Sequence, residues 1–149
     1  MSEKLNDKHL EAWRGFITTY ATLIDLINRR MVETDVIPIH WYDVLIEVYE
    51  SPDRRLRLNE LARKVVLSKS GLTRLVDKLV EAGLLLRESS PEDGRGAYAV
   101  LTDAGLEAMR KAWPVYAQGI QKYFAQHLKI DEAETLTQAF ERMLTAARE

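Results

Sequence analysis

The chain has 149 residues, 46% of them hydrophobic, and a net charge of −2. This length suits one domain with a buried core. The absence of cysteine excludes disulfides, thiolate zinc sites and cysteine redox sensing. No run reaches the roughly 18 apolar residues that a membrane span needs. Residues 1–8 are polar and do not resemble a signal peptide, so we expect a cytoplasmic protein without a membrane partner.

The charges are unevenly distributed. Residues 51–95 hold ten Lys and Arg against seven Asp and Glu, a net charge of +3, whereas the remainder has a net charge of −5. Contact with nucleic-acid phosphates needs a local basic patch rather than a basic protein. The distribution favours residues 51–95 as a nucleic-acid-binding part, and ordinary scatter of charge is the alternative.

Two helices are predicted in the N-terminal third. Residues 7–33 carry apolar side chains at helical spacings of three and four: Leu10, Trp13, Ile17, Tyr20, Ile24, Ile27 and Met31. Further apolar residues widen this stripe, so a second face requires burial and invites a partner chain. Pro38 disfavours helix in the residue before it, which separates this helix from one predicted over residues 39–49.

Short elements follow. Residues 51–53 read as a turn, and residues 55–58 alternate polar and apolar side chains as a strand does. Asn59 is the predicted N-cap of a short helix over residues 60–65, because its side chain can accept a hydrogen bond from a first-turn N–H.

The next predicted helix has the character of a DNA-reading helix. Ser68 caps it, it runs to about residue 82, and Gly83 takes the usual position after a helix end. A helix in the major groove offers short side chains near its start and polar ones along its outer face. Arg74 suits a bidentate contact with guanine. The predicted contacts are Ser68, Lys69, Ser70, Thr73, Arg74 and Lys78. The alternative is an amphipathic helix with a solvated outer face.

A hairpin is predicted directly after this helix. Its strands, residues 84–88 and 98–101, flank a loop rich in Pro, Gly and charge. Arg95, between two glycines, suits insertion into a minor groove. Asp93 is expected to pair with Arg95 or Arg87 and to support the loop. The alternative is a surface hairpin with incidental charge.

Two C-terminal helices complete the chain. Thr102 caps the first, whose apolar stripe reaches residue 128 and contains Pro114, so a kink or break is expected there. Asp131 followed by Glu134 suggests a capping box for a last helix over residues 132–147.

Residues 56–105 resemble the winged helix-turn-helix of MarR-type bacterial transcription regulators. The matching stretches are Leu58-Asn59-Glu60-Leu61-Ala62, residues 68–80, Gly83-Leu84-Leu85 and Leu101-Thr102-Asp103-Ala104-Gly105. The resemblance implies a mainly α fold with a small β-hairpin (α+β). Within a single domain of residues 1–149, residues 37–101 would form the DNA-binding lobe, and residues 7–33 and 103–147 the helical dimerisation region.

The resemblance also implies a function. It predicts a homodimer on a palindromic operator in double-stranded DNA, and repression, less often activation, that a small ligand relieves. The family's wing usually reads Asp-x-Arg-Asp-x-Arg, whereas this chain has Glu92-Asp93-Gly94-Arg95, so only Asp93 and Arg95 carry over as wing residues. The oxidant-sensing branch of the family uses a reactive cysteine, which this chain lacks.

A small, apolar aromatic effector would suit the aromatic residues of the helices expected to flank the DNA lobe. The candidates are Trp13, Phe16, Tyr20, His40 and Trp41. Aromatic side chains at helical spacing are more often simple core, which is the alternative here.

No enzyme or metal protein is indicated. The three histidines are far apart in sequence and lack the spacing of metal ligands, and neither a phosphate-binding glycine loop nor a nucleophile elbow is present. No cofactor is expected. Two rival functions stay open: a winged-helix protein-interaction module that has lost DNA binding, and a ligand or metal sensor whose output is not DNA.

Overall fold

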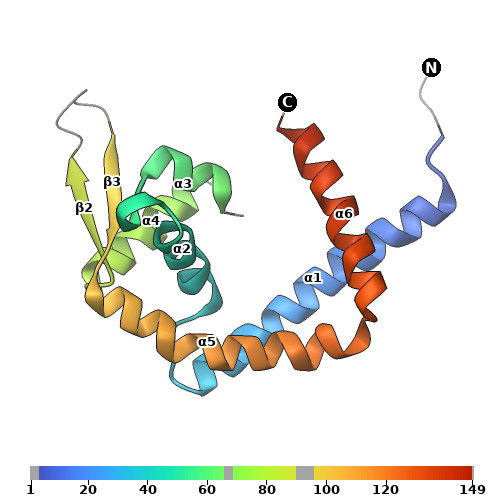
Figure 1. The fold of residues 1–149 in the computed structure, drawn as a ribbon, viewed down its shortest axis with the longest axis horizontal. Coiled ribbons are helices and arrows are strands. Elements are labelled where there is room, and N and C mark those ends of the chain that lie inside the picture. Colours follow the sequence, from blue (N-terminus) through green and yellow to red (C-terminus); the bar gives the residue numbers. More distant parts are fainter. Residues whose placement is uncertain (1–3, 66–68, 90–95, 149) are drawn as a thin grey trace. The chain divides into compact units, whose positions relative to one another are not determined.

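The computed structural model describes residues 4–65, 69–89 and 96–148 of the chain. Helices dominate, and three short strands form one antiparallel sheet in the order β1-β3-β2 (Figure 1). The predicted fold class, mainly α with a small β-hairpin, is confirmed. The chain divides into two compact units, residues 28–116 and a second unit made of residues 1–27 and 117–149.

The unit of residues 28–116 contains the sheet. After the end of α1 (Asp7–Glu33), it comprises α2 (Ile39–Tyr49), the 3-10 turn η1 (Pro52–Arg54), β1 (Arg55–Arg57), α3 (Leu58–Lys64) and α4 (Lys69–Glu81). The hairpin strands β2 (Leu85–Ser89) and β3 (Ala97–Leu101) follow, and then the start of α5 (Asp103–Tyr123). This is the element order of a winged helix-turn-helix.

The core of this unit lies between the helices and the inner face of the sheet. Because side chains alternate along a strand, Leu56 of β1, Ala99 of β3 and Leu85 of β2 all point inward and are buried. The helices contribute the largest fully buried side chains of the unit: Met31, Ile39, Val44, Leu45, Val48, Leu61, Val76 and Leu79.

Local interactions determine where α2 begins and where α4 ends. Pro38 precedes α2, and the Asn28 side chain accepts a hydrogen bond from the Ile39 N–H at 3.0 Å, so a residue of α1 satisfies the first turn of α2. Gly83 ends α4 with a φ of 79°, a left-handed conformation that suits glycine. The Leu84 N–H then reaches back to the Leu79 carbonyl at 2.9 Å, which confirms the predicted helix end.

The start of α5 is held against the end of α4. The Thr102 hydroxyl donates to the Gly83 carbonyl at 2.7 Å and accepts from the Gly105 N–H at 2.9 Å, as the predicted cap requires. Glycine is needed at position 105, because a Cβ there would collide with the Leu84 carbonyl oxygen and lie 2.7 Å from the Leu101 side chain. Thr102, which directly follows β3, thus anchors the hairpin to the end of α4.

Three predicted helix boundaries are wrong. Helix α3 begins at Leu58, directly after β1, so Asn59 lies in its first turn and not at its N-cap. Helix α5 ends at Tyr123, before the predicted stripe does, and it continues through Pro114, so of the predicted kink or break only the break is contradicted. Helix α6 (Ile130–Ala147) begins two residues early, because Glu132 accepts the Lys129 N–H at 3.0 Å in place of the predicted capping pair.

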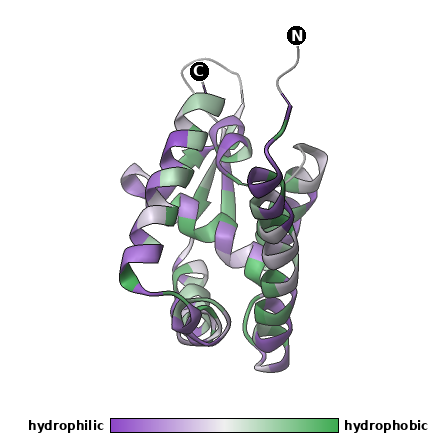
Figure 2. Ribbon diagram, turned by 90° about the vertical axis from the view of Figure 1, so that its right-hand side faces the viewer, coloured by the Kyte–Doolittle hydropathy of each residue, from purple (hydrophilic) through white to green (hydrophobic). Residues whose placement is uncertain are grey.

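The second unit consists of helices: the first part of α1, the last part of α5, the 3-10 turn η2 (Ala125–His127) and α6. The rings of Phe16 in α1 and Phe140 in α6 pack with centroids 5.6 Å apart. None of the residues of α6, all of which the structure describes, is buried. Figure 2 shows hydrophobic and hydrophilic residues interspersed along the helices. Trp13, Phe16 and Tyr20 of α1 and Met143 and Leu144 of α6 are exposed, so this unit leaves apolar side chains uncovered.

Candidate DNA interface

Helix α4 presents a polar face to solvent. Its buried side consists of Leu72, Leu75, Val76 and Leu79, and the side chains of Ser70, Thr73, Arg74, Asp77 and Lys78 are exposed. Because residues three and four apart share a face of a helix, Ser70 and Arg74 form one row, and Thr73 and Asp77 form the next. Four of the predicted contact residues therefore lie on the solvent side of a helix held by a leucine-rich core.

The other predicted residues of this module are described only in part. Lys69 is the first residue of α4. The predicted cap Ser68 and the predicted wing residues Asp93 and Arg95 lie outside the described residues.

Arg87, predicted as a wing support, is joined to helix α4. It lies in β2 opposite Ala99 of β3, and its Nη2 atom is 2.5 Å from Oδ1 of Asp77. From the sequence, Asp93 was expected to pair with Arg95 or Arg87. The partner Asp77 was not predicted, because the wing sequence carries no sign of a carboxylate on the preceding helix.

The outer face of the sheet carries two arginines that the sequence reasoning did not single out. The guanidinium groups of Arg55 and Arg57 lie 4.2 Å and 4.9 Å from the ring centroid of Tyr98, and Arg55 also pairs with Glu88 at 3.4 Å. Their alternation with Leu56 in the predicted strand was a usable signal, because it places both on one face. Basic side chains thus lie on the sheet as well as on α4.

An aromatic cluster joins α2 and α5 within the unit of residues 28–116. The rings of Tyr42, Trp113 and Tyr116 lie with centroids 5.2 to 5.9 Å apart, and the Tyr116 hydroxyl donates to Oδ1 of Asp43 at 3.1 Å. Burial raises the pKa of Tyr42 and of Asp43, and for Asp43 the hydrogen bond from Tyr116 and the charge of His40 partly oppose this rise. The cluster thus contains one carboxylate, that of Asp43, whose charged form is disfavoured by burial.

Replacing Asp43 with Asn is expected to stabilise the fold at neutral pH. Because the pKa of Asp43 is higher in the folded than in the unfolded state, folding favours its neutral form, and this contribution is lost as the pH rises through the folded pKa. Asparagine is neutral at every pH and still accepts from Tyr116. The thermal midpoint of Asp43→Asn should exceed that of the wild type at neutral pH, and the gap should narrow under acid. A lower midpoint at neutral pH would show that the charge of Asp43 is stabilising.

The predicted effector residues fall into both units. In the helical unit, the side chains of Trp13, Phe16 and Tyr20 are exposed, and the rings of Trp13 and Phe16 lie 6.1 Å apart. In the unit of residues 28–116, His40 is exposed and Trp41 is half-buried, beside the Tyr42 that belongs to the aromatic cluster.

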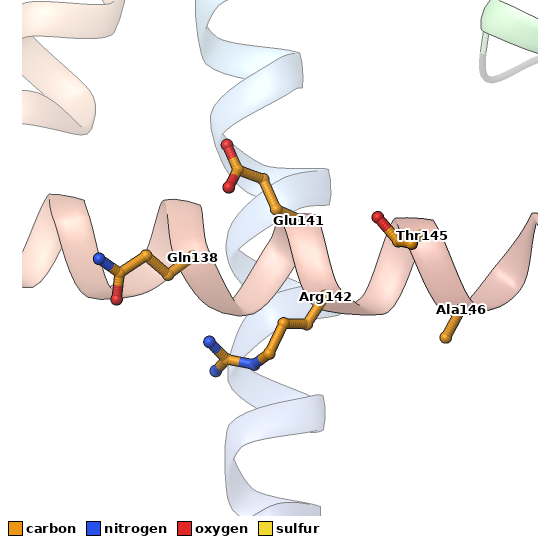
Figure 3. Close-up of a pocket in the computed structure, with 5 residues that line it drawn as sticks. All are labelled: Gln138, Glu141, Arg142, Thr145 and Ala146. Atoms are coloured by element: carbon orange, nitrogen blue, oxygen red, sulfur yellow. The ribbon is translucent and has the colours of Figure 1, made fainter.

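A surface hollow runs along α6 and is lined by Gln138, Glu141, Arg142, Thr145 and Ala146 (Figure 3). All five side chains are exposed and come from one helix, so no second element encloses a bound molecule there. Among the described residues, no three His, Asp or Glu side chains gather as a metal site requires. In the same part of the chain, no helix is both long and apolar enough to cross a bilayer.

Comparison with known proteins agrees with this geometry. A family model described as MarR family matches residues 34–96. The HTH-type transcriptional regulator YkoM of Bacillus subtilis is 36% identical over 80 residues, which is 54% of this chain and 51% of YkoM. The HTH-type transcriptional regulator MhqR of the same organism is 26% identical over 93% of both chains. The match therefore spans about half of YkoM and nearly all of MhqR.

A solved structure shares the whole fold. Sco3205 of Streptomyces coelicolor, a MarR family transcriptional regulator crystallised in complex with DNA, superposes with a TM-score of 0.87 at 28% identity, covering 98% of this chain and 91% of Sco3205. The fold and the exposed face of α4 define a winged helix-turn-helix protein. The MarR family model over residues 34–96 and the shared fold make the chain similar to MarR family transcriptional regulators.

Proposed function

We propose that the chain is a sequence-specific, double-stranded DNA-binding repressor that acts as a homodimer on a palindromic operator. The observation that carries this proposal is helix α4, whose apolar side is buried and whose exposed side presents Ser70, Thr73, Arg74 and Lys78. These side chains can donate to phosphates or base edges in a major groove. Sco3205, with the same fold, was crystallised with DNA. Because its proposed partner is DNA, we propose that the protein is located in the cytoplasm.

The reading of DNA is assigned to two elements. Helix α4 enters the major groove, with Arg74 reading guanine and Ser68, Lys69 and Lys78 contacting phosphates. The wing between β2 and β3 carries Arg95 into the adjacent minor groove, with Asp93 and Arg87 as its supports. In a dimer, two such lobes would read half-sites about 10 base pairs apart.

Arg74→Ala is expected to relax specificity at one position of each half-site. Loss of a bidentate contact with guanine costs about 1–3 kcal/mol at that base pair and little elsewhere. The measurement is the affinity for a set of duplexes in which each base pair of the selected site is changed in turn. Lys78→Ala is the matched control on the same face, for which an even loss across all duplexes is expected. An even loss with Arg74→Ala would assign Arg74 to a phosphate.

The proposal of a homodimer rests on uncovered apolar surface in the helical unit. Trp13, Phe16, Ile17 and Tyr20 of α1 are 43 to 58% exposed, and Met143 and Leu144 of α6 are 62% and 51% exposed. Contiguous apolar surface of this kind marks protein interfaces. A second copy of the chain, pairing through α1 and α6, would cover it.

We further propose that a small, aromatic ligand releases the DNA. The candidate contacts are Trp13, Phe16 and Tyr20, at the edge of the proposed dimer surface, and in the other unit His40 and Trp41, beside the cluster at Tyr42. RdhR-CbdbA1625, a transcriptional regulator with this fold, was crystallised with 2,4-dichlorophenol. The test is titration of the DNA complex with substituted phenols, for which release of DNA is expected. Complexes that persist at saturating phenol would contradict the proposal.

A further inference from the structure

The side of α4 that is proposed to face DNA contains one carboxylate, that of Asp77. Asp77 follows Thr73 by four residues and Arg74 by three, so it lies among the proposed DNA contacts, and its side chain is 56% exposed. A negative charge at this position repels the phosphates that the same helix face would approach. A cation held beside Asp77 would remove this repulsion.

Arg87 supplies that cation from a different element. It lies on β2 two residues after the buried Leu85, so both point to the face of the sheet that packs against the helices. Its guanidinium reaches Asp77 at 2.5 Å while its side chain remains 38% exposed. The contact joins the middle of α4 to the first strand of the hairpin.

The ion pair between Arg87 and Asp77 is expected to contribute little to the stability of the fold. Ion pairs between exposed side chains contribute little to folding, because water screens them and two long side chains lose conformational freedom. The leucine core already holds α4 in place, and the Thr102 anchor already holds the hairpin. The position of the pair, between the groove-facing helix and strand β2, points instead to DNA binding.

We propose that Arg87 is a positioning residue that acts on DNA through Asp77. It neutralises the carboxylate on the groove-facing side of α4, and the resulting pair holds β2 against that helix. Arg87 does not itself bind a phosphate in this account. The inference rests on the proposed function, because it gives Asp77 and Arg87 a role in binding double-stranded DNA.

The test is a double-mutant cycle in the full-length chain. The variants are Arg87→Met, which keeps the aliphatic part of the side chain, Asp77→Asn, and both together. The probe is a short duplex carrying the sequence that the wild-type chain selects from a random library. Arg110→Met is the matched control, since Arg110 is an exposed arginine paired with Glu107 of its own helix. Thermal midpoints of all variants verify folding.

Arg87→Met alone is expected to weaken binding by about threefold to tenfold, because it leaves Asp77 unpaired among the phosphates. The double variant should recover to within about twofold of the wild type, since the carboxylate is gone. Asp77→Asn alone should bind at least as tightly as the wild type, Arg87→Lys should retain most of the affinity, and Arg110→Met should have no effect.

The dependence on salt separates this role from a direct contact. If Arg87 bound a phosphate, every variant lacking it would lose about one unit of salt slope per lobe, the double variant included. If it acts through Asp77, the double variant keeps the wild-type slope. Wild-type affinity in Arg87→Met, or a double variant as weak as Arg87→Met, would overturn the inference while leaving the proposed function intact. If the wild-type chain selected no sequence from the library, both the inference about Arg87 and the proposed function would be contradicted.

Discussion

Replacing Met143 and Leu144 together with Glu is expected to convert the proposed dimer into monomers and to lower operator affinity by about 100-fold or more. Both side chains are more than half exposed on α6, a helix that buries none of its residues within the protomer. The protomer should therefore keep its fold, whereas two carboxylates forced into an apolar interface lose their hydration without gaining partners. A monomer presents one lobe to DNA and loses the advantage of binding both half-sites at once.

Sedimentation equilibrium and a gel-shift titration of the same samples measure the two effects. The matched control is Gln138→Glu combined with Thr145→Glu, which adds two carboxylates to the polar side of α6 (Figure 3). We expect the control to stay dimeric and to bind DNA. A Met143 and Leu144 variant that remains dimeric would show that subunits pair through another surface.

Leu79→Ala is expected to lower the free energy of unfolding by about 2–5 kcal/mol. Leu79 is fully buried on the inner side of α4, and its carbonyl accepts the hydrogen bond from Leu84 that ends the helix. Its truncation removes apolar contacts and leaves a cavity between α4 and the rest of the unit. Operator affinity should fall with it, since α4 would no longer be held with its polar side outward.

Urea unfolding at one fixed chain concentration measures this loss, since the apparent stability of a dimer depends on concentration. Leu86→Ala is the matched control, because the same atoms are removed from a leucine that is 54% exposed on β2. The control should cost less than about 1 kcal/mol. Equal losses for the two variants would mean that α4 does not pack as described.

The sequence predicted the elements that local signals control. Pro38 and Gly83 marked the boundaries of α2 and α4, because proline and glycine restrict or permit backbone conformations wherever they stand. Thr102 was predicted correctly as a cap, because a threonine hydroxyl can accept a hydrogen bond from an N–H of the first helical turn. The start of α3 was missed, because its N-cap position is Arg57, which makes no side-chain cap, and the helix simply follows the last paired residue of β1.

Contacts between segments that are distant in the chain could not be predicted from the sequence. The pairing of Arg87 with Asp77 depends on the register of β2 against β3 and on the packing of α4, neither of which the wing motif encodes. The cluster of Tyr42 with Trp113 and Tyr116 joins helices about seventy residues apart in the chain. The composition of the α4 face could be predicted, because it requires only helical periodicity, but the groups that balance its charges could not.

The central claim, that this chain is a sequence-specific DNA-binding dimer, is tested most directly by selecting duplexes from a random library with the wild-type protein. Titration of the selected duplex at about 50 and 200 mM salt completes the experiment. The account predicts one enriched palindrome with half-sites about 10 base pairs apart, two chains per duplex and a steep fall in affinity with salt. A library that emerges unenriched, with no shifted complex at either salt concentration, would contradict it.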